Sequence, residues 1–315
     1  MMNKDAKIFI AGHEGMIGIA LVRCLKTAGF NNLVTKSFSQ LDLTNQSEVR
    51  KFFLQEVPEY VFLAPIKEGG ILANTNYPAE LIYTNLQVQT NIIHFAWEIK
   101  VKKLLFLGSS CIYPKFCPQP MKEEVLLTGL LEPTNEAYAI AKIAGIKMCQ
   151  AYNKQYNTNF ISVIPTNIYG PYDNFDLRTS HVIPGLIGKF HQAKIGKKEE
   201  VIIWGSGNPR REFLYVDDFA DACIFLMNNY NQSEIINVGY GKDISIRELA
   251  SIIKEITEFD GVLNFDDTKP DGMPYKLLDI SKINKLGWSV KTDLKKGLKK
   301  TYIWFKEIEE GKQNK

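Results

Sequence analysis

Short apolar segments alternate with helical patterns through the first half of this chain, and that order constrains the fold more than any other feature of the sequence. Strand-like runs are predicted at residues 7–11, 32–36, 60–64, 103–107 and 160–164. The longest helical patterns between them cover residues 79–98 and 135–156. Strands that alternate with helices predict an α/β fold: a doubly wound parallel sheet of the Rossmann type, with helices on both faces.

The pattern loosens after the fifth strand, where proline, asparagine, glycine and aspartate become frequent. The later elements that the sequence predicts are a strand at 201–204 and helices at 181–191 and 294–310. Ser245 and Glu248 form a capping-box pattern ahead of a further apolar helix. We expect two domains. Residues 1–166 are expected to form the first domain, joined by a return segment near 213–240, and residues 167–315 are expected to form mainly a smaller α/β domain.

Composition and charge narrow the function classes. Hydrophobic residues make up 45% of the 315 residues, and a net charge of +3 is too small to indicate nucleic acid or an anionic membrane as a partner. No apolar run approaches the roughly 20 residues of a membrane span, and the N-terminal apolar stretch is too short for a secretory signal. We therefore expect a cytoplasmic enzyme. The five cysteines lack paired metal spacing, so no metal site is expected.

Three glycines stand between the first strand and the first helix, in the order Gly12, Gly15 and Gly18. Glycines at such a turn let backbone N–H groups approach a pyrophosphate at the N-terminus of the helix. The spacing is G-x-x-G-x-x-G, and the alternative is a glycine-rich turn needed only for packing. The strand before the glycines and the helix after them favour dinucleotide binding.

The end of the second strand indicates which dinucleotide is bound. A cofactor with a free 2′-hydroxyl usually meets an acidic residue there, but this chain has Lys36 and no acid. Lys36 could hold a 2′-phosphate, which favours NADP(H). Glu14 argues against it, because a carboxylate repels a phosphate, so NAD(H) is also possible. Asp42 is expected near the adenine.

A hydroxyl, a phenol and an ammonium follow in an order that suits hydride transfer. The fourth strand ends in "GSSCIYP", and along an extended segment Ser109 and Cys111 would share one face while Ser110 turns away. Tyr138 and Lys142 are four residues apart and therefore neighbours on a helix face. A lysine near a tyrosine favours the phenolate, which makes a usable proton donor and acceptor. Taken alone, the pair could equally be a packed tyrosine beside a solvated lysine.

These residues resemble the extended short-chain dehydrogenase/reductase superfamily, and longer blocks resemble its GDP-L-fucose synthase family. The blocks are "LLFLGSSCIYPK", "LEPTNEAYAIAKIAGIK", "PTNIYGPYDNF", "SHVIP", "WGSGNPRREFLYVDD" and "KPDGMPYKLLD", spread over nearly the whole chain. The resemblance implies a catalytic set comprising Ser109, Cys111, Tyr138, Lys142 and His181. It implies that Cys111 and His181 exchange the protons at C3 and C5 of a keto sugar. Considered alone, Cys111 could be an inert buried thiol and His181 a cap or a packed ring.

The resemblance also implies binding residues. The positions expected to contact the cofactor are Gly12, Gly15, Met16, Ile17, Gly18, Lys36, Asp42, Leu43, Leu107, Gly108, Lys142, Pro165, Asn167 and Ile168. The positions expected to contact the GDP-sugar substrate are Lys189, Trp204, Arg211 and Lys276. Among these, an arginine suits a diphosphate best, because its planar guanidinium binds phosphate with two hydrogen bonds.

The activity implied is the NADP(H)-dependent epimerisation at C3 and C5, and reduction at C4, of GDP-4-keto-6-deoxy-D-mannose to GDP-L-fucose. Three alternatives stay open. The first is a C4 reductase alone, acting on a related GDP-4-keto-6-deoxy sugar such as a heptose. The second is a nucleotide-sugar dehydratase or 4-epimerase. Dehydratases place an acidic pair just after the catalytic hydroxyl, and the presence of Ser110 and Cys111 there argues against this class. The third is a catalytically silent dinucleotide-binding protein, a class that usually lacks the tyrosine or the lysine.

The chain departs from the family pattern at several positions. Glu14 and Phe38 stand where arginines usually grip a 2′-phosphate, and Tyr275 stands where a basic residue is usual. Pro65, Ile66 and Glu68 replace the usual small residues beside Lys67 in "APIKEGG". A homodimer is expected by family, with the helices at 79–98 and 135–156 forming a four-helix interface.

Overall fold

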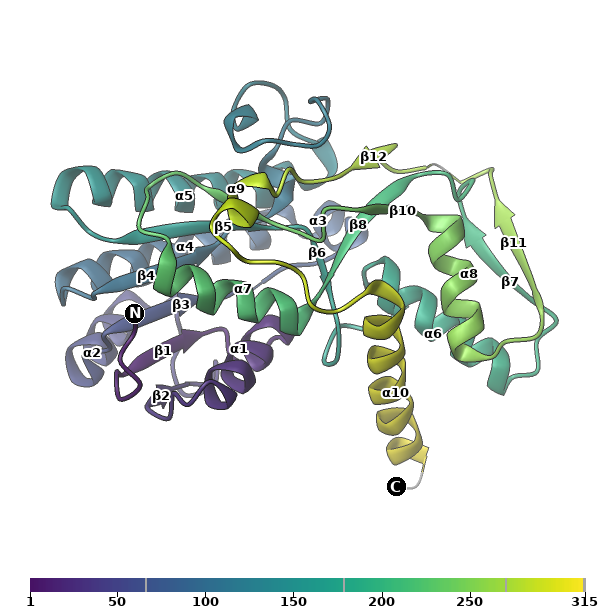
Figure 1. Ribbon diagram of the computed structural model, residues 1–315, viewed down its shortest axis with the longest axis horizontal. Coiled ribbons are helices and arrows are strands. Elements are labelled where there is room, and N and C mark those ends of the chain that lie inside the picture. The colour runs from purple at the N-terminus through teal and green to yellow at the C-terminus, as the bar shows by residue number, and fades with distance from the viewer. Residues whose placement is uncertain (66, 178, 270, 314–315) are drawn as a thin grey trace.

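The computed structural model describes residues 1–65, 67–177, 179–269 and 271–313 (Figure 1). Within them, six parallel strands form one sheet in the order β2-β1-β3-β4-β5-β9. These strands are β1 (Ile8–Ala11), β2 (Leu33–Val34), β3 (Tyr60–Leu63), β4 (Lys103–Leu107), β5 (Phe160–Pro165) and β9 (Ile236–Val238). The predicted α/β fold with a doubly wound parallel sheet is confirmed.

Helices cover both faces of this sheet (Figure 1). On one face, α1 (Met16–Thr27) packs against α7 (Val216–Asn229), and on the other lie α2 (Gln46–Glu56), α4 (Pro78–Glu98) and α5 (Glu136–Tyr156). Side chains alternate along a strand, so Ile8 and Ile10 join the first layer while Phe9 and Ala11 join the second. All four are almost completely buried. Full burial of a large apolar side chain contributes about 2 kcal/mol, so the two layers stabilise the sheet from both sides.

The second lobe, on the right of Figure 1, is built around β8 (Arg210–Tyr215). Its partners are antiparallel β10 (Asp243–Ser245) and the parallel strands β6 (Asn167–Tyr169) and β12 (Tyr275–Lys276). The remaining elements of this lobe are α6 (Val182–Ile195), α8 (Ile246–Thr257), α10 (Leu294–Gln313), β7 (Glu200–Trp204) and β11 (Val262–Asp266). Their apolar side chains enclose a third core.

Buried polar side chains fasten segments from different parts of the chain together. Asn237 on β9 accepts a hydrogen bond of 2.5 Å from the Tyr113 hydroxyl. Its amide nitrogen donates to the carbonyl oxygens of Met121 at 3.0 Å and Asp279 at 3.1 Å. The buried Glu212 carboxylate accepts from two backbone N–H groups of neighbouring loops. The bonds of Asn237 hold the chain around Met121 and Asp279 beside β9, which is an edge strand of the sheet.

Several local predictions are confirmed. The fourth strand has the predicted bounds, and Ser245 and Glu248 form the capping box that begins α8. The helix predicted at 181–191 runs on to Ile195, and the second strand shortens to two residues. Within the described stretches of chain, no helix combines the length and apolar character needed to cross a bilayer.

Candidate active site

A cavity of about 580 Å³ opens where the carboxyl ends of the sheet strands meet the second lobe. Ligands of open α/β sheets bind at this end of the strands. The predicted site residues that line the cavity are Met16, Ile17, Gly108, Ser109, Cys111, Tyr138, Pro165, Asn167, Ile168, His181, Lys189, Trp204, Arg211 and Lys276. The structure thus brings together residues that are up to 260 positions apart, from Met16 to Lys276 (276 − 16 = 260).

The glycine loop beside this cavity fits a pyrophosphate. Gly12 has a φ of 79°, a conformation that favours glycine. A Cβ at Gly18 would overlap the carbonyl oxygen of Gly12 and lie 2.5 Å from the Cα of His13. Gly15 begins α1 without a capping side chain, so the first N–H groups of the helix stay free for an anion. The loop therefore suits the dinucleotide that the sequence predicts.

The Glu14 carboxylate lies beside the loop that follows β2. Glu14 Oε2 accepts a hydrogen bond of 3.1 Å from the backbone N–H of Phe38, which ties the glycine loop to the loop that contains Lys36. Asp42 uses Oδ1 to accept bonds from the N–H and the hydroxyl of Thr44, just before α2. The predicted cofactor residues that stand outside the cavity lining are Gly12, Gly15, Gly18, Lys36, Asp42, Leu43, Leu107 and Lys142.

The end of β4 differs from the expectation of an extended chain. The strand stops at Leu107, and Ser110–Ile112 forms a single 3₁₀ turn that Ser109 caps, because its hydroxyl oxygen accepts a bond of 3.4 Å from the N–H of Cys111. The prediction that Ser110 turns away was wrong. In the tighter turn Ser109, Ser110 and Cys111 all line the cavity.

Tyr138 and Lys142 lie on the first turns of α5, both buried. The Lys142 ammonium donates to the carbonyl oxygen of Leu107 at 3.0 Å and lies 5.6 Å from the centre of the Tyr138 ring. Burial lowers the pKa of Lys142 to about 8, opposed by the negative charges of Glu68 and Cys111. Burial also holds the pKa of Tyr138 well above its usual value of about 10. Tyr138 is therefore protonated at neutral pH and is able to donate a proton.

The sulfur and the imidazole face this cavity from different elements. Cys111 is 8% exposed, and burial raises the pKa of its thiol, while the charge of Lys276 and a hydrogen bond with Ser109 oppose that rise. His181 stands at the N-terminus of α6, exposed, and its side chain makes no capping bond. His181 therefore does not act as a side-chain cap, whereas the burial of Cys111 agrees with either role considered for that thiol.

Cations gather in the part of the cavity that the second lobe supplies. Lys189 lies 5.6 Å from the centre of a Trp204 ring, and Lys276 on β12 is paired in register with Arg211 on β8. Burial lowers the pKa values of Lys189, Arg211 and Lys276. Among the described residues, the Lys276 ammonium has no hydrogen-bond partner. This group of cations provides the charge that a diphosphate requires.

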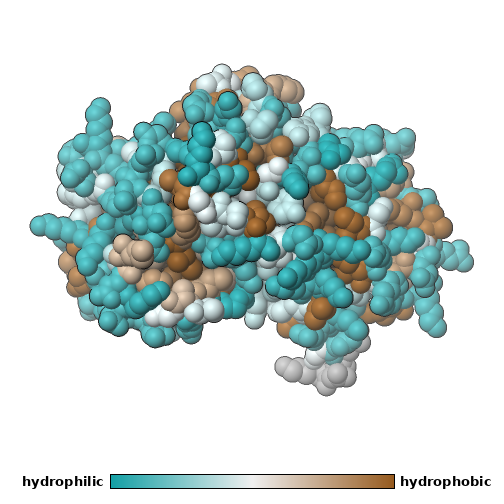
Figure 2. Space-filling model, in the orientation of Figure 1, coloured by the Kyte–Doolittle hydropathy of each residue, from teal (hydrophilic) through white to brown (hydrophobic). Residues whose placement is uncertain are grey.

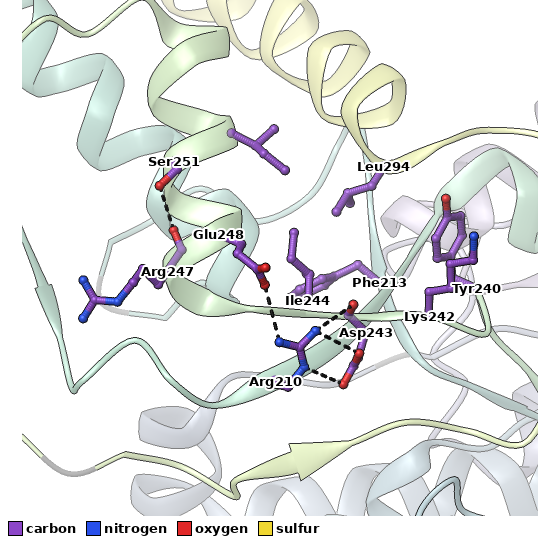
Figure 3. A pocket seen from close by; sticks show the side chains of 11 residues that line it. Arg210, Phe213, Tyr240, Lys242, Asp243, Ile244, Arg247, Glu248, Ser251 and Leu294 are labelled. Carbon is purple, nitrogen blue, oxygen red and sulfur yellow. Dashed lines mark hydrogen bonds and ion pairs between the residues drawn. The ribbon is translucent and has the colours of Figure 1, made fainter.

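A second pocket, of about 710 Å³, opens on the other side of β8, between α8 and the start of α10 (Figure 3). Its Arg210 is held by Asp243 at 2.9 Å and by Glu248 at 3.5 Å. Phe213 and Leu294 give it apolar walls, and apolar side chains appear over this region in Figure 2. It contains none of the predicted site residues: Arg210 lines this pocket, Arg211 lines the other cavity, and Phe213 lines both.

Asn74 and Asn135 are among the residues of the first cavity that sequence reasoning missed. Asn135 stands three positions before Tyr138, and that spacing on a helix could have indicated it. Glu68, noted above as a departure, also lines the cavity, whereas Ile66 lies outside the described residues. Within the part of the chain that the structure describes, no group of three or more histidine, cysteine or acidic side chains could hold a metal ion.

Comparisons with known proteins agree with this geometry. Residues 8–239 match the model of the NAD dependent epimerase/dehydratase family. The chain is 58% identical over 305 residues to GDP-L-fucose synthase 1 of Arabidopsis thaliana, which covers 97% of this chain and 94% of that protein. It is 50% identical over 310 residues to GDP-L-fucose synthase of Escherichia coli, covering 96% and 97%.

Among solved structures, the chain is similar to a GDP-mannoheptose C4 reductase of Campylobacter jejuni with NADP bound. The two share 44% identity and a TM-score of 0.90, over 97% of this chain and 100% of that one. The family match spans most of the chain, and these relatives align along nearly its whole length. The chain therefore belongs to the NAD dependent epimerase/dehydratase family.

Proposed function

We propose that this protein is an enzyme that converts GDP-4-keto-6-deoxy-D-mannose to GDP-L-fucose, by epimerisation at C3 and C5 and NADPH-dependent reduction at C4. One observation carries the proposal: Ser109, Cys111, Tyr138 and His181 line a single cavity that also holds the cations suited to a GDP group. Relatives at 50–58% identity named GDP-L-fucose synthase support the same activity.

Epimerisation uses the acidity that the C4 carbonyl gives to its neighbours. Removal of a proton from C3 or C5 forms an enolate, whose negative charge lies on the C4 oxygen. The hydroxyls of Ser109 and Tyr138 donate hydrogen bonds to that oxygen, and donors held in place in this way contribute several kcal/mol. At each carbon, Cys111 and His181 act from opposite sides, one removing the proton and the other returning one, which inverts the centre.

Reduction follows at C4. NADPH, when bound against the glycine loop, supplies the hydride. The Tyr138 hydroxyl then gives its proton to the C4 oxygen, and the hydrogen-bonded ammonium of Lys142 stabilises the phenolate that remains. The raised pKa of Tyr138 suits this direction of reaction, because the phenol stays protonated until the carbonyl oxygen gains negative charge.

Binding of the nucleotide rests on the second lobe. Arg211, Lys189 and Lys276 bind the two phosphates, and Trp204 contributes to the same GDP site. Lys36 is the cation available to a 2′-phosphate at the end of β2, and NADP-bound neighbours support NADP(H) as the cofactor. Because the Glu14 carboxylate lies beside the loop that contains Lys36 and would repel a 2′-phosphate, the enzyme also uses NAD(H).

A second candidate is a reductase that acts at C4 only, on a related GDP-4-keto-6-deoxy sugar such as a heptose. The Campylobacter jejuni neighbour named a GDP-mannoheptose C4 reductase favours it. The relatives at higher identity favour the synthase, as does the presence of both Cys111 and His181 in the cavity.

The test is to incubate the protein with GDP-4-keto-6-deoxy-D-mannose and NADPH. The proposal expects NADPH to be oxidised and the product to be GDP-L-fucose by NMR. Reduction to a sugar that keeps the D-configuration at C5 would establish the C4 reductase instead. NADH in a parallel reaction shows how far the cofactor choice is relaxed.

Three further expectations belong to the proposal. Residues 1–166 with 213–240 bind the cofactor, and residues 167–315 supply most of the substrate site. The chain forms a homodimer through α4 and α5, which pack together and leave Tyr83 and Ile140 exposed on their outer sides. It works in the cytoplasm. Light scattering after gel filtration tests the dimer: a monomeric mass would contradict it.

A further inference from the structure

Among the residues that the structure describes, two carboxamide oxygens in the wall of the reaction cavity have no hydrogen-bond partner. They are Oδ1 of Asn74 and Oδ1 of Asn135, both shielded from bulk water. An acceptor that is buried without a donor costs about 1–3 kcal/mol, so folded proteins seldom keep one without a reason. Two such oxygens in one cavity, contributed by different elements, need an explanation.

The orientation of Asn74 is fixed by its neighbours. Its Nδ2 donates to the carbonyl oxygens of Gly69 at 2.6 Å and Gly70 at 3.0 Å. A flipped amide would place Oδ1 against those two carbonyls, so the observed orientation is the only one that satisfies them. Asn74 is 8% exposed and lies on α3 (Ile71–Asn76), which contacts the turn Pro133–Asn135. The free oxygen is thus held firmly in the wall.

Asn135 is unusual for a residue at its position. It is the N-cap of α5, where an asparagine normally uses Oδ1 to accept a bond from one of the first backbone N–H groups of the helix. Here the side chain makes no capping bond, and Oδ1 has no partner in the described parts of the chain. It stands one helical turn before Tyr138, the proton donor of the proposed reaction. Its oxygen is therefore available beside the reacting carbonyl.

The residues around Asn74 and Asn135 indicate that this part of the cavity binds the sugar rather than the nucleotide. The cations that suit a diphosphate come from β8, β12 and α6, whereas Asn74 and Asn135 stand with Tyr138. Two neutral acceptors with no donor match hydroxyl groups, which are the donors of a pyranose. Building on the proposed function, we infer that Asn74 and Asn135 accept hydrogen bonds from the C2 and C3 hydroxyls of the sugar ring and so select a sugar that carries both hydroxyls over analogues that lack one of them.

A site that hydrogen-bonds a substrate hydroxyl discriminates strongly against an analogue without it, since its own polar groups are then left unpaired. The experiment measures the dissociation constants of GDP-4-keto-6-deoxy-D-mannose and of its 2-deoxy and 3-deoxy analogues, by calorimetry on the protein loaded with NADP⁺. We expect the wild type to bind the hydroxylated sugar at least about 10-fold more tightly than one of the analogues. Asn74→Leu and Asn135→Leu should each bring that ratio to about 1–3, with NADP⁺ affinity unchanged.

Asn153→Leu is the matched control. Asn153 is on the same helix, but its amide is already used in bonds to Phe160 and Thr158. This change should leave the ratio at the wild-type value. Because the ratio compares two ligands on one sample, it does not depend on the fraction of protein that is folded.

Equal affinities in the wild type, or ratios that both leucine variants leave unchanged, would overturn the inference. Discrimination in binding without turnover of the keto sugar would instead refute the proposed function and leave the inference standing.

Discussion

Replacement of Lys142 by methionine removes a cation that lies against Tyr138 while keeping a side chain of similar length. The Lys142 ammonium lies 5.6 Å from the centre of the tyrosine ring. At that separation, with an effective dielectric constant of about 20, a unit positive charge attracts a phenolate by about 3 kcal/mol. A barrier raised by about 3 kcal/mol slows a reaction by about 100-fold. We therefore expect Lys142→Met to lose about 100-fold in the rate of C4 reduction.

The pH dependence follows from the same residue. Burial lowers the pKa of Lys142 to about 8, so the ammonium is present below that pH and is lost above it. Only the ammonium stabilises the phenolate, so the wild-type rate should fall as pH rises through about 8. Lys142→Arg keeps its charge across this range and should lack the fall, even if its rate is lower throughout.

The assay should isolate reduction from epimerisation, because the titration of Cys111 would otherwise contribute to the profile. We would supply the sugar already inverted at C3 and C5, and follow NADPH oxidation under single-turnover conditions. A Lys142→Met variant that keeps its rate within about threefold of the wild type would refute the electrostatic role. So would a wild-type profile with no fall between neutral pH and the normal pKa of lysine.

Three other substitutions test separate parts of the structure. Gly18→Ala should weaken NADP⁺ binding about 30-fold in calorimetry, because relief of the overlap with Gly12 costs about 2 kcal/mol; unchanged affinity would show that the loop does not hold the pyrophosphate. Glu14→Gln should improve NADP⁺ binding relative to NAD⁺ by about fivefold, since it removes a negative charge beside the 2′ position; no change in that ratio would place the 2′-phosphate elsewhere. Lys103→Met should lower the free energy of unfolding in urea by about 3 kcal/mol, because the Lys103 ammonium donates hydrogen bonds to three carbonyl oxygens at the end of α7. Lys102→Met, which removes an exposed ion pair, should leave the free energy of unfolding almost unchanged.

Most of the sheet could be predicted because its strands are short apolar runs with clear limits. The fourth strand is completely buried along its five residues, and glycine follows it directly. The capping box at Ser245 could also be predicted, since both of its hydrogen bonds lie within four residues. These two features could be predicted because they depend on residues that are close in the sequence.

The site was harder to derive, because its geometry depends on tertiary contacts. The turn at Ser110 could not be predicted from alternation, since the chain leaves the strand at Gly108, where a Cβ would lie 2.5 Å from Ile164. Arg210 and Arg211 line different pockets because different elements pack against β8 around each of them, and the sequence alone does not place those elements. The unpaired oxygens of Asn74 and Asn135 are invisible without coordinates, because a missing partner is not a property of the sequence.

The central claim is that a thiol and an imidazole in this cavity exchange protons on the carbons beside C4. The most direct measurement is to hold GDP-4-keto-6-deoxy-D-mannose in deuterated water with the protein and NADP⁺, without reductant, and to record deuterium at each ring carbon by NMR. The account predicts deuterium at both C3 and C5 with the wild type, and loss of this labelling with Cys111→Ser or His181→Asn. A wild-type protein that leaves C3 and C5 unlabelled, yet reduces C4 when NADPH is added, would contradict it.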